Sequence, residues 1–114
     1  MDVLSSFLRF MMKIVSSNKK DELSSNQKRA LAYYNRGVIW SLKGENDLAI
    51  RDFNEAISSN PQFAKAFAMR GRKWFEKSDL EQALNDFQSS LRLNPDDQEV
   101  ASAIQFLKKL MEIK

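Results

Sequence analysis

Hydrophobic residues in this chain recur every three to four positions over several stretches, the spacing that gives a helix one apolar face. Residues 25–43 and 46–59 follow this pattern, and residues 95–113 follow it again. The 114 residues include three Gly and two Pro, and few are β-branched, so helices are favoured over strands. We therefore predict an all-α fold, and the length suits a single domain.

The sequence also repeats itself at a distance of 34 residues. Residues 33–40 read YYNRGVIW and residues 67–74 read FAMRGRKW, so an aromatic residue, Arg-Gly and Trp stand in the same register. Each unit is predicted to form two helices joined by a turn, at residues 43–46 in the first unit and 77–79 in the second. Further identities in this register are Ala30/Ala64, Ala32/Ala66, Lys43/Lys77, Ala49/Ala83, Asp52/Asp86, Phe53/Phe87, Asn60/Asn94 and Pro61/Pro95.

Polar residues mark the start of two of the predicted helices. Ser24 is followed three positions later by Gln27, and Ser78 is followed in the same way by Glu81. This is the spacing of a capping box, in which the hydroxyl and the later side chain satisfy backbone amides that the helix itself leaves free. We therefore expect one helix to begin just after Ser24 and another just after Ser78.

This pattern resembles the tetratricopeptide repeat (TPR), whose 34-residue helix-turn-helix unit carries an aromatic residue, Gly, an aromatic residue, Ala, Phe and Pro at fixed offsets. The resemblance covers residues 28–95 and implies two repeats, at residues 25–61 and 62–94. One departure is Arg36, repeated as Arg70, where the family usually has Leu. The matching positions are Tyr33, Gly37, Trp40, Ala49, Phe53, Ala56 and Pro61 in the first repeat, and Phe67, Gly71, Trp74, Ala83, Phe87 and Pro95 in the second.

Residues 95–114 follow the second repeat and are predicted to form a C-terminal capping helix. The Asn-Pro pairs at 60–61 and 94–95 predict that Asn caps the helix that follows, with Pro in its first position. The apolar face of the last helix is wide, so this helix either wraps the second repeat deeply or touches another chain. Its apolar residues are Val100, Ile104, Leu107 and Met111, with Phe106, Leu110 and Ile113 beside them.

Residues 1–17 are predicted to form a separate amphipathic helix, joined to the repeats by the polar linker 18–24. Its apolar arc spans roughly 200° and requires a partner surface. Three partners remain open: the chain's own repeats, a second copy or another protein, and a membrane surface. The polar side carries few basic residues, which favours protein over anionic lipid. The candidate residues for self-association or membrane binding are Leu4, Phe7, Leu8, Met11, Ile14 and Val15.

The resemblance implies that the first helices of the repeats line a concave groove that binds peptides or helices. One hypothesis is that the N-terminal helix, or its copy from a second chain, fills the apolar half of this groove. A second is that Lys65, Arg72 and Lys73 bind an acidic peptide or phosphate, unless they form a solvated helix face paired with Glu76 and Asp79. The candidate groove residues are Leu31, Tyr34, Asn35, Val38 and Leu42 in the first repeat and Lys65, Met69, Arg72 and Phe75 in the second.

Several functions are disfavoured by what the chain lacks. It contains no His and no Cys, so imidazole bases, thiol nucleophiles and the usual zinc sites are absent, and we expect no enzyme, cofactor or metal. A net charge of +3 is too small to indicate a nucleic-acid partner. No apolar run reaches the roughly 20 residues that span a bilayer, and a cytoplasmic protein is expected.

These observations together predict a non-catalytic scaffold or adaptor for protein–protein interaction. It would bind a peptide or helix in the groove, self-associate as a homo-oligomer through its terminal helices, or do both. The alternative is a peripheral membrane adaptor docked by residues 2–17. Some TPR proteins bind the acidic C-termini of heat-shock chaperones through a clamp of Lys and Asn. Tyr34 and Val38 stand at those positions here, so this activity is not expected.

Overall fold

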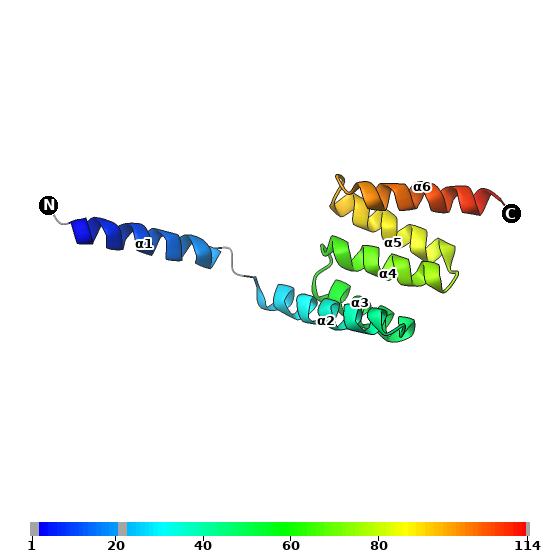
Figure 1. Ribbon diagram of the computed structural model, residues 1–114, viewed down its shortest axis with the longest axis horizontal. Helices are drawn as coiled ribbons and strands as arrows, with labels where there is room; N and C mark the ends of the chain where they lie inside the picture. Colours follow the sequence, from blue (N-terminus) through cyan, green and yellow to red (C-terminus); the bar gives the residue numbers. More distant parts are fainter. Residues whose placement is uncertain (1–2, 21–22, 114) are drawn as a thin grey trace.

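The computed structural model describes the backbone of residues 3–20 and 23–113, and the side chains of residues 3–12 and 23–113. These residues form helices and no strand, which confirms the all-α prediction (Figure 1). The helices are α1 (Val3–Lys20), α2 (Ser25–Leu42), α3 (Asn46–Ser59), α4 (Ala64–Glu76), α5 (Leu80–Leu93) and α6 (Gln98–Glu112).

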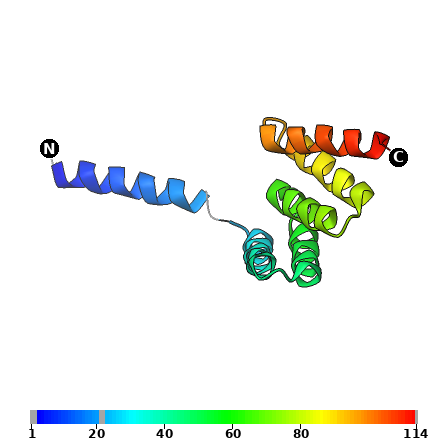
Figure 2. The ribbon, with the colours of Figure 1, turned by 45° about the vertical axis from the view of Figure 1, so that its right-hand side comes forward.

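Helices α2 to α6 form a stack in which each helix packs against the one before it in the chain. α2 with α3, and α4 with α5, are the two predicted helix-turn-helix units, and α6 covers the end of the stack (Figure 2). α2 also contacts α4, so the first helices of the units line the same side of the stack. α1 points away from the stack and packs on none of these helices within the described part of the chain (Figure 1).

Small residues let the two helices of each unit approach closely. A Cβ atom added at Gly37 would lie 2.7 Å from Cε1 of Phe53, a ring that is completely buried. At Gly71 the equivalent distance, to Cε1 of Phe87, is 3.2 Å. Ala49 and its counterpart Ala83 are also completely buried. Small residues on one helix therefore pack against a large ring on the other, and this approach is closer in the first unit.

The last helix joins the core of the second unit. Val100, Ile104 and Leu107 of α6 are buried and form one cluster with Ala83 and Phe87 of α5. Phe106 and Ile113, which lie beside that face, remain exposed. The predicted capping helix therefore covers the second repeat with its central stripe, and Leu110 also packs against this cluster, whereas Phe106 and Ile113 stay outside it.

One predicted capping box is confirmed and the other is wrong. The Oγ atom of Ser24 accepts a hydrogen bond from the Gln27 amide at 3.1 Å, and the Gln27 side chain accepts one from the Ser24 amide at 2.9 Å. Ser78 instead adopts a left-handed conformation with φ 65°, like Gly44 with φ 77° in the first unit. The N-cap of α5 is Asp79, because Ser78 already terminates the preceding helix.

The Asn-Pro pairs were also assigned to the wrong helix. α4 begins at Ala64 and α6 begins at Gln98, three residues after each Pro. Asn60 ends α3, and its Oδ1 atom accepts a hydrogen bond from the Gln62 amide at 3.2 Å. The N-cap of α6 is Asp97. Each Asn therefore closes the helix before it, and each Pro lies in the turn between helices, where its fixed φ is also acceptable.

Candidate functional site

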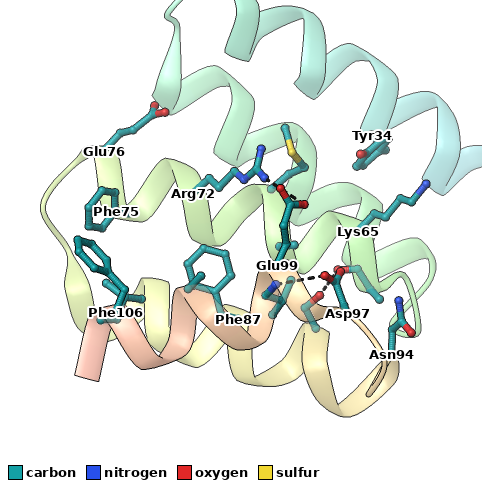
Figure 3. Close-up of a pocket in the computed structure, with 17 residues that line it drawn as sticks. Tyr34, Lys65, Arg72, Phe75, Glu76, Phe87, Asn94, Asp97, Glu99 and Phe106 are labelled. Atoms are coloured by element: carbon teal, nitrogen blue, oxygen red, sulfur yellow. Dashed lines mark hydrogen bonds and ion pairs between the residues drawn. The ribbon is translucent and has the colours of Figure 1, made fainter. Parts of the chain in front are cut away.

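A pocket of about 530 Å³ lies where α2, α4 and α6 meet on the concave side of the stack. Five of the predicted groove residues line it: Tyr34, Lys65, Met69, Arg72 and Phe75 (Figure 3). Leu31, Asn35, Val38 and Leu42 lie on α2 outside this pocket. They occupy positions 34 residues before pocket residues Lys65, Met69, Arg72 and Glu76, and thus extend the same face along α2.

The last helix, which is not among the predicted groove elements, also lines this pocket. Glu99, Ala103 and Phe106 of α6 line the pocket. Each stands 34 residues after a groove residue of α4, namely Lys65, Met69 and Arg72. Applying the 34-residue register a third time would have found them, because α6 occupies the position of a first helix.

The pocket combines an aromatic wall with opposite charges. The rings of Phe75 and Phe106 meet edge to face, with their centroids 6.2 Å apart. Nη2 of Arg72 lies 3.9 Å from Oε2 of Glu99, and both side chains are largely exposed (Figure 3). An exposed ion pair of this length is weak, so Arg72 remains available to a stronger anionic ligand.

Tyr34 forms the α2 end of the pocket. Its ring centroid lies 4.8 Å from that of Phe63 and 5.7 Å from that of Phe53, so the ring rests on the core of the first unit. Burial of the side chain raises the pKa of Tyr34 above its ordinary value. The phenol is thus neutral at physiological pH and can both donate and accept a hydrogen bond at the pocket rim.

Lys73 does not belong to the groove. Its side chain is buried, and its Nζ atom donates a hydrogen bond to Oε2 of Glu76 at 2.8 Å. The pairing of Lys73 with Glu76 was the alternative to an anion site. Because Lys73 is buried and already paired, it does not share an anion site with Lys65 and Arg72.

The repeated Arg residues have a structural partner that the sequence analysis missed. Nε and Nη2 of Arg36 donate hydrogen bonds to Asp52 at 2.7 and 2.8 Å. Arg70 makes the same two bonds to Asp86, both at 2.8 Å. The hydrogen bonds from Arg36 lower the pKa of Asp52 below its ordinary value. The joint repetition of Arg and Asp was the available signal for this pair.

The apolar face of α1 is exposed in the described residues. Leu4, Phe7, Leu8 and Met11 all remain open to solvent. The side chains of Ile14 and Val15 lie outside the described residues. α1 does not fill the groove of its own chain in this structure, because it packs on none of the described helices that line it. No described helix is long and apolar enough to cross a bilayer. The described residues also contain no cluster of carboxylates suited to a metal ion.

Comparison with known proteins agrees with the repeat pattern. Residues 30–63 match the tetratricopeptide repeat family. The first TPR of Spaghetti (RPAP3), solved with the HSP90 peptide SRMEEVD, is similar with a TM-score of 0.70 and 24% identity, over 73% of this chain and 66% of that one. The second TPR domain of human RPAP3, solved with the HSP70 peptide SGPTIEEVD, has a TM-score of 0.66 and 28% identity, over 70% and 67%.

A third similar structure is that of MamA, with a TM-score of 0.73 and 19% identity, over 77% of this chain and 51% of the MamA chain. This chain therefore spans about half of the MamA chain and about two thirds of the first RPAP3 chain. No curated protein sequence matches it. The match of residues 30–63 to this family and the similarity to these structures show that the chain has a tetratricopeptide-repeat fold. Its fold is a helical-repeat array of a kind that generally mediates protein interactions and not catalysis.

Proposed function

We propose that this chain is a protein-interaction adaptor that binds a peptide segment in the concave groove of α2, α4 and α6. The observation that carries the proposal is the pocket of about 530 Å³ in which first helices from both repeats and the last helix converge. Its lining combines apolar and aromatic side chains with converging charged groups of both signs, and such a mixture suits a ligand site. The charged residues are Lys65, Arg72, Glu76, Asp97 and Glu99.

The charges and rings of the pocket suggest the chemistry of the peptide. An apolar side chain would insert beside Phe75 and Phe106, and a neighbouring carboxylate would reach Lys65 and Arg72. Both RPAP3 structures hold peptides with adjacent acidic and apolar residues, which supports this class of ligand. The heat-shock peptides themselves are not expected, because Tyr34 and Val38 replace the polar residues of the clamp.

The experiment is selection from a library of short peptides, followed by fluorescence anisotropy titration of the strongest binder. Arg72→Glu is expected to weaken binding on the order of tenfold, since it replaces an attractive charge with a repulsive one. Arg92→Glu is the matched control, because it makes the same charge change on α5, outside the pocket. Equal affinity of both variants and of Phe75→Ala would refute groove binding.

We also propose that the chain self-associates through α1. The exposed apolar residues of that helix support this, because in proteins most of the stability of a helix comes from packing its apolar face against a partner. Light scattering after gel filtration, on the full chain and on a chain lacking residues 1–17, tests it. A dimeric full chain with a monomeric truncation is the expected result, and two monomers would contradict it.

A peripheral membrane adaptor docked by residues 2–17 is the competing proposal for the same exposed face. Co-sedimentation of the full chain with vesicles of mixed neutral and anionic lipid measures it directly. Binding that requires residues 1–17 would favour the membrane. If the chain does not bind at lipid concentrations that saturate known amphipathic helices, the membrane proposal is wrong and a protein partner for α1 is favoured.

A further inference from the structure

α4 and α6 each present one face to the helix that precedes them in the stack. On α4 this face packs on α3, and on α6 it packs on α5. The 34-residue register identifies three positions on this face in each helix. On α6 all three residues are buried, and on α4 two are buried while the third is an Arg held in an ion pair. The residues are Ala66, Arg70 and Lys73 on α4 and Val100, Ile104 and Leu107 on α6.

The same face of α2 is open. Ala32 and Ile39, which correspond to the buried Ala66 and Lys73, are exposed, and Ile39 keeps 52% of its surface while Lys73 keeps 5%. The Arg36 side chain is 54% exposed, whereas that of Arg70 is 21% exposed. No described helix lies against α2 in the way that α3 lies against α4.

The hydrogen bonds of Arg36 and Arg70 also show that α2 lacks the neighbouring helix that α4 has. Besides its bonds to Asp86, Arg70 donates a hydrogen bond from Nη1 to Oδ1 of Asn54, on the preceding α3, at 2.8 Å. Arg36 makes the bonds to Asp52, and no described residue accepts from its Nη1 atom. The face of α2 that corresponds to the covered face of α4 therefore has space for another helix, which the described part of the stack does not provide.

The chain's own α1 is poorly placed to fold back onto this face. After α3 and after α5 an Asn-Pro turn reverses the chain before the next helix. The equivalent positions before α2, residues 26–29, continue as helix, because α2 begins at Ser25 behind its capping box. α2 thus has 18 residues where α4 has 13, and α1 extends away from it (Figures 1 and 2).

We propose that the open face of α2, defined by Ala32, Arg36 and Ile39, is the docking surface for α1 of a second copy of this chain. α1 and α2 are the same length, 18 residues each, and follow one another in the chain. Two chains related by a two-fold axis would place α1 of each beside α2 of the other. Each swapped α1 would lie antiparallel to α2, as α3 lies against α4. Phe7, Leu8 and Met11 would then cover Ile39.

This inference rests on the proposed self-association and is independent of peptide binding in the groove. The first test is the mass of the full chain by light scattering, with Ile39→Glu and Met11→Glu each expected to raise the dimer dissociation constant on the order of tenfold or more. Val38→Glu, on the groove side of α2, and Ser6→Glu, an exposed polar position of α1, are the matched controls and should remain dimeric. Circular dichroism should show unchanged helix content, because all four positions are at least partly exposed within the chain.

The outcomes separate the possible contacts. If Met11→Glu dissociates the dimer but Ile39→Glu does not, self-association stands and the α2 surface is wrong. If Val38→Glu alone dissociates it, α1 fills the groove instead. A monomeric full chain overturns both the inference and the proposed self-association. Vesicle binding that is lost with Met11→Glu but not with Ile39→Glu assigns the face to a membrane.

A second test shows whether the contact lies between chains. The natural chain has no Cys, so single substitutions give unique labelling sites. A chain with Met11→Cys is mixed with a chain with Ile39→Cys and treated with a short bis-maleimide reagent. A mixed covalent dimer is expected, and excess unlabelled full chain should compete it away. Cross-linking only within a single chain that carries both substitutions would show that α1 folds back onto its own α2, and would overturn the proposal.

Discussion

The two repeats of this protein share a sequence register but differ in how completely they are packed. In the second repeat Arg70 is enclosed between Asp86 and Asn54, and α4 is covered by α3. In the first repeat the described hydrogen bonds of Arg36 go to Asp52 alone, and the outer side of α2 is open. Conversely, the close approach at Gly37 is tighter than that at Gly71. We therefore expect identical residues at equivalent positions of the two repeats to contribute differently to the free energy of unfolding.

The largest expected difference concerns the Arg–Asp pairs. Arg70→Leu leaves the buried Asp86 without its cation, and we expect a loss of about 3 kcal/mol in the free energy of unfolding. Arg36→Leu should cost less, because the Arg36 side chain is 54% exposed against 21% for Arg70, so water screens its ion pair with Asp52 more strongly. Urea unfolding followed by circular dichroism measures both. Equal losses would mean that the exposure of the Arg side chain does not matter.

The glycines provide the next comparison. Gly37→Ala forces the buried Phe53 ring to move, and we expect a loss of about 1–3 kcal/mol from overpacking. Gly71→Ala brings Cβ no closer than 3.2 Å to Phe87, so the better helix propensity of Ala should offset much of the strain. Thermal melts of the two variants rank them. A more damaging Gly71→Ala would show that the second unit is the more rigid one.

Acid should weaken the first repeat through Asp52. The pKa of this carboxyl is lower in the folded chain than in the unfolded chain, because Arg36 stabilises the charged form. The contribution to stability is therefore present above the unfolded value of about 3.9 and is lost as the pH falls through the lower folded value. Urea midpoints at neutral pH and near pH 3 test this, with Arg36→Leu as a reference that should lose less on acidification.

The smallest effect is expected at the turns. Ser78 adopts a positive φ that Gly44 adopts without strain, so Ser78→Gly should stabilise the protein by about 0.5–1 kcal/mol. Gly44→Ala should destabilise it by a similar amount, although no side chain lies within 4 Å of that position. Differential scanning calorimetry resolves both shifts. An unchanged melting temperature for Ser78→Gly would indicate that the Ser side chain compensates for the backbone strain.

The fold could be predicted closely from the sequence, and the site only in part. The hydrophobic periodicity and the paired Gly and Phe residues involve positions close together in the sequence, so they can be recognised from the sequence alone. The helix ends were harder, because Asn60 and Asn94 can close one helix or open the next with similar local chemistry. The α6 part of the pocket was missed because α6 carries none of the repeat's Gly, Trp or Phe positions, although it occupies the same place in space.

By itself the sequence determined the helices, the 34-residue register and the close contacts inside each unit, since these depend on residues near one another in the chain. Tertiary structure alone decided which face of each helix is covered. Ala32 and Ala66 are the same residue in the same repeat position, yet Ala66 is buried and Ala32 is exposed. The reason is that burial depends on the neighbouring helix, which α4 receives from α3 and which α2 does not receive from the described part of its own chain.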